Sequence, residues 1–280
     1  MDTLPLVRCV GVTAPQPSLQ DNTADLDRLR AALVHSLDQG LATRPLAIPF
    51  AAMGPVAARF REAGFSGLAV LNVLPDRLEL ADFLAAPPPL LPAMALDLGT
   101  THLEATLLDL QTGSTLARAH TPNRQIEYGA DILSRIHFAA TGGKAEAGGL
   151  TRLQQAVVES INSLAGDLAR HADITPQAIR AVSVSGNTTM VHLLLGLDPY
   201  HICREPYIPL VNAPDPLAAA DIGLAIHPRP RSGCCPARAV ISAAISSPVS
   251  WPAVWTGWKR PACSSTWAPM PRWSWATGTG

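Results

Sequence analysis

Hydrophobic residues in the first ninety positions recur both in short runs and at helical spacings, which predicts strands alternating with helices. The run at 6–12 is typical of an edge strand, and the largely apolar run at 68–74 predicts a buried one. A helix around 56–63 is expected to end at Gly64. These elements together predict a small α/β module.

An earlier helix in this module is predicted from four leucines that lie three or four residues apart and therefore share one helical face: Leu26, Leu29, Leu33 and Leu37. Asn22 or Thr23 is expected to cap this helix, and Gly40 to close it. A stiff run of prolines at 87–89, followed by Pro92, then predicts the end of the module. We therefore expect one α/β domain over residues 1–92.

The chain after Pro92 predicts a hairpin whose turn has the residue types of a phosphate site. Gly99 lets backbone amides approach a phosphate, and the hydroxyls of Thr100 and Thr101 can donate to its oxygens. Asp97, just before the turn, can hold Mg²⁺ through water. The same residue types are favoured in ordinary polar turns, so the turn alone leaves both interpretations open.

A second glycine-containing loop follows a predicted strand at 178–185 and precedes a helix that begins near Val191. The loop places Gly186, Asn187 and Thr188 at the positive end of the helix dipole, which is an anion site in principle. Asn187 is also a candidate to orient a nucleophile or a phosphate. The alternative is that a side chain of this loop only caps the helix.

A long amphipathic helix is predicted between the two loops, over about 151–171. Its apolar stripe is expected to be core rather than a cofactor site, and it consists of Leu153, Val157, Ile161, Leu164 and Leu168. His192, on the later helix, has no second ligand at metal-binding spacing, so a packed histidine is favoured over a ligand or a base.

Charge and cysteine content narrow the classes of partner. The chain has 21 basic and 22 acidic residues without a basic stripe, so nucleic acid and anionic membranes are not expected partners. No secretory leader and no apolar stretch of about 18 residues is present, which favours a cytoplasmic protein. No iron–sulfur cluster can be assigned to the cysteines, which form no CxxC pair: Cys9, Cys203, Cys234, Cys235 and Cys263.

The last fifty or so residues differ in composition from the rest of the chain. All six tryptophans fall between Trp251 and Trp275, and no period of a helix or a strand accompanies them. Tryptophan and methionine each have one codon, so the nucleotides under residues 265–271 can be partly reconstructed. One shifted frame admits Asp-Leu-Gly-Thr-Asn-Ala, a second phosphate-loop sequence. We therefore expect a frameshift near Ser232 and a non-native, unstructured tail over 233–280.

Three blocks of the sequence resemble the reductive activators of corrinoid proteins, a family of ATPases in the actin and sugar-kinase superfamily. The blocks are 95–101, 123–136 and 185–197, continued by 205–209, and the second of them is the family-specific one. The resemblance implies an α/β protein in which a middle domain at 1–92 precedes the first lobe of a ribonuclease-H-like ATPase fold at 93–232.

The resemblance also implies a function and a set of site residues. Family members use ATP and Mg²⁺ to drive electrons from an iron–sulfur cluster onto the cobalt of an inactive, oxidised corrinoid protein. Asp97 and Asn187 are then the catalytic candidates, and Asp97 holds the metal. The cofactor-binding set becomes Asp97, Gly99, Thr100, Thr101, Gly186, Asn187 and Thr188. The expected partners are a corrinoid protein, a separate ferredoxin or other electron donor, and a second copy of the chain.

Two departures from the family pattern limit this expectation. The family's amino-terminal ferredoxin module, which carries a [2Fe–2S] cluster, is absent, and the second phosphate loop and adenosine pocket would fall in the tail. The polypeptide is therefore expected to be an inactive fragment. Two other functions remain open: a non-catalytic binding module for a corrinoid protein, and a sugar kinase or related kinase of the superfamily. A sugar kinase needs a catalytic aspartate after the second phosphate loop, which this sequence does not show.

Overall fold

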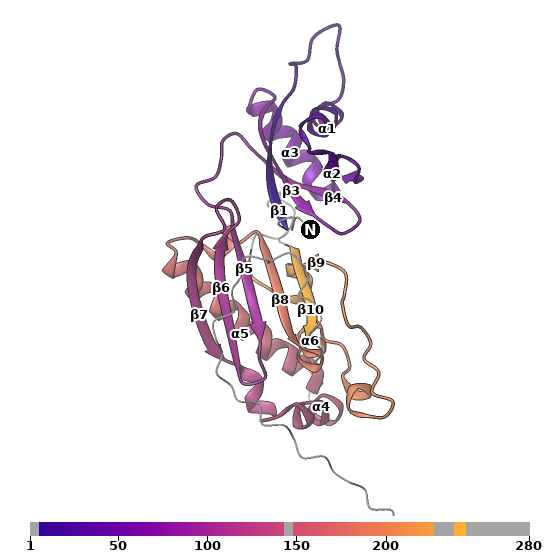
Figure 1. The fold of residues 1–280 in the computed structure, drawn as a ribbon, viewed down its shortest axis with the longest axis vertical. Coiled ribbons are helices and arrows are strands. Elements are labelled where there is room, and N and C mark those ends of the chain that lie inside the picture. The colour runs from indigo at the N-terminus through magenta and orange to yellow at the C-terminus, as the bar shows by residue number, and fades with distance from the viewer. Residues whose placement is uncertain (1–5, 143–147, 227–237, 245–280) are drawn as a thin grey trace, which may run out of the picture.

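A computed structural model describes residues 6–142, 148–226 and 238–244 and shows a mixed α/β protein built on two sheets (Figure 1). The first sheet has four strands in the order β1-β3-β4-β2, and the second has six in the order β7-β6-β5-β8-β10-β9. The buried hydrophobic side chains form two clusters, one for each sheet. The mixed α/β character predicted from the sequence is confirmed.

The first sheet and its helices come from the first 84 residues. Its strands are β1 (Val7–Thr13), β2 (Leu46–Ala47), β3 (Ser66–Val73) and β4 (Leu78–Leu84). Its helices are α1 (Asp25–Ser36), α2 (Gln39–Ala42) and α3 (Phe50–Glu62). β1 lies at the edge of the sheet, as predicted, and pairs antiparallel with β3.

Two local predictions for this part were wrong. The amino-terminal cap of α1 is Ala24, without a side-chain hydrogen bond, rather than Asn22 or Thr23. The Thr23 hydroxyl is instead used in the preceding loop, where it donates to Asp21 Oδ1, and the Asp21 carboxylate also pairs with Arg28. Gly40 does not close α1 but lies within α2, whose cap is Asp38.

The second sheet begins with an antiparallel hairpin, continues with parallel strands and ends in a short antiparallel strand. Its strands are β5 (Pro92–Leu98), β6 (His102–Asp109), β7 (Thr115–Pro122), β8 (Ala181–Asn187), β9 (Leu217–Ala218) and β10 (Arg238–Ala244). β5, β6 and β7 pair antiparallel in sequence order, whereas β8 is parallel to both β5 and β10. The carboxyl ends of β5, β8 and β10 therefore lie at one end of the sheet.

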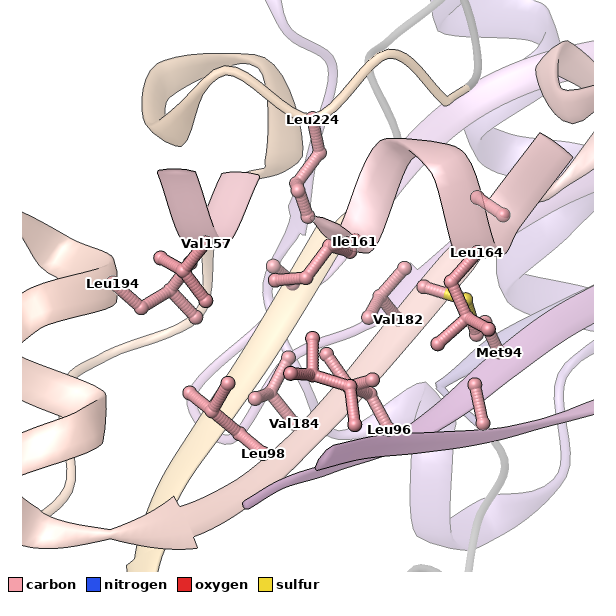
Figure 2. Close-up of a cluster of buried hydrophobic side chains, with 14 of the residues drawn as sticks. Met94, Leu96, Leu98, Val157, Ile161, Leu164, Val182, Val184, Leu194 and Leu224 are labelled. Carbon is pink, nitrogen blue, oxygen red and sulfur yellow. The ribbon is translucent and has the colours of Figure 1, made fainter. Parts of the chain in front are cut away.

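Helices cover one face of this sheet and build its core (Figure 1). They are α4 (Ile132–Thr141), α5 (Gly149–His171) and α6 (Thr188–Leu195), with short 3₁₀ helices η1 (Arg124–Tyr128), η2 (Pro176–Ala178), η3 (Tyr200–Cys203) and η4 (Ala219–Ile222). Figure 2 shows the apolar stripe of α5 packed on side chains of β5 and β8. All five predicted stripe residues are fully buried, which confirms their assignment to the core.

The strand β10 corrects the predicted extent of the non-native tail. Residues 238–244 pair with β8 along its whole length, and Ala239 and Ile241 are buried. The two adjacent β-branched residues Val240 and Ile241 favour a strand here, a short signal beside the tryptophan-rich composition that follows. The remaining tail residues, 233–237 and 245–280, lie outside the described part of the chain.

A buried carboxylate joins the two sheets. Asp82 on β4 forms ion pairs with Arg59 on α3 and with Arg180, which lies directly before β8. Its side chain is only 3% exposed, and Ala93 and Ala181 of the second sheet pack into the core cluster of the first. The polar link and the shared apolar contacts therefore fix the first sheet at the start of the second.

None of the helices in the described ranges is both long and apolar enough to cross a membrane.

Candidate functional site

The two predicted loops lie side by side at the carboxyl end of the parallel strands. In the register of β5 and β8, Asp97 is paired with Ser185 and Leu98 with Gly186. The hairpin turn at 99–101 therefore starts beside the point at which β8 passes into α6. Ligands of open α/β sheets bind outside the carboxyl ends of such strands.

The glycines of both loops are required by the packing of the chain itself. A Cβ atom on Gly99 would lie within 3.0 Å of the His102 carbonyl oxygen, closer than real Cβ atoms come. A Cβ atom on Gly186 would lie 2.9 Å from both Cβ and the carbonyl oxygen of Leu98. The glycines thus allow the hairpin to close and β5 to approach β8, independently of any ligand at the turn.

The second loop is shorter than predicted, because β8 continues through Asn187 and α6 begins at Thr188. Asn187 is the amino-terminal cap of α6, and its Oδ1 atom accepts a hydrogen bond of 2.9 Å from the Thr189 amide. Asn187 therefore caps the helix through its Oδ1 atom, as the alternative interpretation of this loop predicted. Its side-chain amide group is left to donate, and the residue is exposed to solvent.

Solvent can reach the candidate groups of the first loop. Asp97 and Thr101 are exposed and Thr100 is half-buried. On the second loop, Thr188 is half-buried, and its amide belongs to the first turn of α6, which has no carbonyl within the helix to accept from it. Hydroxyl, amide and carboxylate groups of the predicted kinds therefore meet at one accessible edge.

Residues with buried polar side chains donate hydrogen bonds to the carbonyl groups of the turn from the protein interior. Asn123 donates from Nδ2 to the Gly99 carbonyl at 3.0 Å and from its backbone amide to the Thr101 carbonyl at 2.8 Å. Gln125 anchors this arrangement by donating to the Leu153 carbonyl of α5 at 2.9 Å. Both side chains are completely buried.

Arg135 on α4 holds the remaining carbonyl of the turn. Its Nη2 donates to the Thr100 carbonyl at 2.7 Å, and its Nε donates to the Gly129 carbonyl at 2.9 Å. Its Nη1 faces Gln125 Oε1 at 3.3 Å and the Met190 sulfur of α6 at 3.4 Å. The side chain is 0% exposed, and burial lowers the pKa of its guanidinium.

His192 has the packed role that the sequence favoured. It is completely buried on α6, with Nδ1 2.8 Å from the Thr188 carbonyl, and its Nε2 accepts from the Leu210 amide at 3.1 Å. Because Nε2 accepts, Nδ1 carries the proton and donates to Thr188. Both ring nitrogens are used by the backbone, so His192 supports the second loop from within the core.

Metal and cluster ligands are not gathered within the described ranges. No group of three or more His, Cys, Asp or Glu side chains there could form a protein cage for a metal. Mg²⁺ in nucleotide sites is often held by one or two carboxylates together with phosphate oxygens and water, which Asp97 at the edge of the turn fits. Cys9 on β1 and Cys203 on η3 are both free thiols. This part of the chain therefore offers no four-cysteine set for a [2Fe–2S] cluster.

Sequence reasoning missed the residues that support the turn. Asn123, Gln125 and Arg135 lie in the block that carries the family resemblance, but no role was assigned to them. An arginine on an amphipathic helix is ordinarily expected at the surface. The available signal was the concentration of three hydrogen-bonding side chains of different types in a short, family-specific stretch.

Comparison with known proteins gives these features a family context. Residues 92–242 match the family described as the RACo middle region, and residues 1–83 match the RACo linker region. The middle region is therefore the part that contains the second sheet, and the first ninety residues, expected from the sequence to be the middle domain, are the linker region. The match also passes Ser232 and continues to residue 242.

Two relatives extend this result. The chain is 27% identical over 228 residues to the corrinoid activation enzyme RamQ of Eubacterium limosum, which covers 80% of this chain and 36% of that protein. A solved structure of a reductive activator for corrinoid, iron–sulfur protein matches with a TM-score of 0.74 and 26% identity, over 86% of this chain and 36% of that one. The predicted resemblance is confirmed, and the chain spans little more than a third of the length of each relative.

Proposed function

The chain belongs to the RACo family, and on that premise we propose that it is the phosphate-binding part of an ATPase that activates a corrinoid protein by reduction. The observation that carries the proposal is the junction of two loops at the carboxyl ends of β5 and β8. The names of both relatives, which concern corrinoid activation, support the choice of substrate. The antiparallel hairpin followed by parallel strands supports a first lobe of the ribonuclease-H-like type.

Each candidate residue has a role in this proposal. Asp97 holds Mg²⁺ at the edge of the turn, and the Thr100 and Thr101 hydroxyls donate to phosphate oxygens. Gly186 lets β8 lie against Leu98, and the amide of Thr188 adds a donor at the positive end of the α6 dipole. Asn187 uses its free side-chain amide group to orient the terminal phosphate or the attacking water.

ATP supplies the free energy that drives electrons onto the corrinoid cobalt, and this chain supplies one wall of the ATP site. We further propose that the electrons come from a separate ferredoxin or another donor protein. A second wall is needed, because water positioning and stabilisation of transition-state charge require groups fixed on both sides of the phosphate. Each missing charge-assisted hydrogen bond weakens binding by about 1.5–3 kcal/mol, so the chain alone should bind ATP weakly and not turn it over.

Phosphate release from ATP tests this proposal when the chain is compared with a version whose tail is restored to the alternative reading frame. We expect no turnover above background for the chain as it stands and measurable turnover for the restored protein. In the restored protein Asp97→Ala should abolish turnover without unfolding the protein, because Asp97 is exposed. Asp76→Ala is the matched control, since Asp76 is an exposed carboxylate outside the site.

Two results would contradict the proposal. Asp97-dependent ATP hydrolysis by the unrestored chain would show that a single wall suffices. An active restored protein that is indifferent to Asp97→Ala would remove the metal role of Asp97. Capture of a corrinoid protein with equal strength in the presence and absence of ATP would favour the non-catalytic binding module instead.

A further inference from the structure

Arg135 is a buried cation that lies beneath both loops of the proposed site. We propose that Arg135 is the positioning residue of the phosphate turn: it fixes the turn against α6 and supplies the positive charge that attracts an anion there. This inference rests on the proposed phosphate site and assigns a role to a residue outside it. Arg135 does not reach the surface, so it acts through the groups that it holds.

The first argument is the geometry of the turn. Its three carbonyl groups, those of Gly99, Thr100 and Thr101, all accept hydrogen bonds from Asn123 or Arg135. Carbonyl oxygens repel phosphate, and a turn that directs them toward the protein interior is left with its hydroxyls and amides to offer to an anion. Arg135 provides the central of these three bonds, at 2.7 Å.

The second argument is the charge of the guanidinium. Its hydrogen-bond acceptors are two carbonyl groups, the Gln125 amide oxygen and the Met190 sulfur, all of them neutral. No carboxylate of the described residues forms an ion pair with Arg135, although Asp131 lies near enough to favour the charged form. A buried charge without a counter-ion is costly, and an anion at the adjacent turn offsets part of that cost.

The third argument is that the local structure is built to place this side chain. A Cβ atom on Gly129 would lie 2.8 Å from the Arg135 backbone nitrogen and 2.6 Å from Ser134 Oγ, so only glycine fits there. Asp131 and Ser134 form a capping box that fixes the start of α4, and Arg135 follows directly after Ser134. The Arg135 side chain also donates to the Gly129 carbonyl, which lies just before this helix. The guanidinium therefore contacts the first loop at Thr100 and, through Met190, the helix α6 that begins at the second loop.

The experiment compares Arg135→Met, which removes the charge and the donors, with Arg135→Lys, which keeps the charge but not the fork of donors. Arg124→Met is the matched control, because Arg124 is an exposed arginine on η1 that forms an ion pair with Glu159 on α5. Each 280-residue protein is first checked for folding by circular dichroism. Two quantities are then measured: the hydrogen exchange rate of the Asn123 amide, which donates to the Thr101 carbonyl of the turn, and the affinity for inorganic tripolyphosphate at low and high salt.

We expect Arg135→Met to raise the exchange rate of the Asn123 amide, because the turn that accepts from it loses its central hydrogen bond, and to weaken tripolyphosphate binding. Each change should be about tenfold or more, the scale set by one hydrogen bond from a charged donor. Arg135→Lys should recover the affinity more fully than the exchange rate, since it restores the charge alone. Arg124→Met should change neither quantity by more than about twofold, as is usual for an exposed ion pair.

A second variant covers the case in which Arg135→Met does not fold. Gln125→Glu places a carboxylate beside Arg135 Nη1, so that the guanidinium stays in place but its positive charge is compensated by an ion pair. The hydrogen bond from residue 125 to the Leu153 carbonyl is lost in this variant. Gln125→Glu should weaken tripolyphosphate binding by about tenfold, again the scale of one charge-assisted contact, with the Arg135–Thr100 bond retained.

The outcomes separate this inference from the proposed function. An unchanged exchange rate and affinity in Arg135→Met, with tripolyphosphate bound by the wild type, would overturn the role of Arg135 and leave the phosphate site standing. A wild-type protein that binds no tripolyphosphate, while exchange rises in Arg135→Met, would refute the phosphate site and the charge argument. It would sustain the role of Arg135 in holding the turn.

Discussion

Replacing Gly99 by alanine adds one methyl group at the tightest point of the hairpin turn. The added Cβ atom would come closer than 3.0 Å to the carbonyl oxygen of His102, a backbone atom that cannot turn aside. The φ angle of Gly99 is not in the left-handed region, so an alanine meets no conformational strain there and the clash alone decides the result. The turn must therefore open, which displaces the start of β6 from β5.

The size of the effect follows from the cost of inserting a methylene into a packed site, about 1–3 kcal/mol. A loss of about 2 kcal/mol corresponds to a fall in Tm of about 4–8 °C for a protein of this size range. Gly166→Ala is the matched control, because Gly166 lies in the middle of α5 and a Cβ atom there meets nothing within 4 Å. That change should instead stabilise the protein by about 0.5–1 kcal/mol, the helix-propensity difference between the two residues.

Calorimetry and urea unfolding of the two variants and the wild type measure these opposite signs. The Gly99→Ala protein should unfold first and the Gly166→Ala protein last. A Gly99→Ala protein as stable as the wild type would refute the close-packed turn, and with it the geometry from which the phosphate site is argued.

Two further variants test buried polar groups. Asp109→Asn should cost about 1–2 kcal/mol in urea unfolding at pH 7, because the carboxylate accepts from the Leu91 and Gln111 amides and the Thr112 hydroxyl. Burial alone would raise the pKa of Asp109, but these hydrogen bonds outweigh it and lower that pKa. The difference in free energy of unfolding between wild type and Asp109→Asn should therefore shrink as the pH falls below about 4. A difference that stays constant with pH would contradict this. His192→Leu should lower the free energy of unfolding by about 2–4 kcal/mol, since the Thr188 carbonyl and the Leu210 amide lose their side-chain partner. His137→Leu, on the exposed face of α4, is the control and should cost little. If the two variants were equally stable, the Thr188 and Leu210 groups would have found other partners.

Periodicity and turn chemistry were sufficient to predict the elements that carry the site. The five-residue stripe of α5 has a strong helical period, and the hairpin of β5 and β6 has a glycine turn between two apolar runs, so local sequence determines both. Gly196 closes α6 with φ of 68°, the conformation for which glycine is selected at a helix end.

Other features depend on contacts that a local pattern does not encode. β4 is almost entirely buried, so it lacks the alternation that marks a half-exposed strand, and its Asp82 is stabilised by arginines from distant positions. Arg135 is buried because carbonyl groups at Thr100 and Gly129 accept from it. Such pairings are set by the tertiary fold, and sequence spacing does not reveal them.

The central claim is that the turn at 99–101 and the junction at 186–188 bind the phosphates of one nucleotide. Titration of the ¹⁵N-labelled chain with Mg²⁺ and a non-hydrolysable ATP analogue, followed by NMR, tests this claim directly. The account predicts that the amide signals of Gly99, Thr100, Gly186 and Thr188 shift together and saturate with one dissociation constant, that of a weak complex. Signals of the first sheet should not shift. The absence of saturating shifts at these amides at millimolar nucleotide, or saturation on another surface, would contradict it.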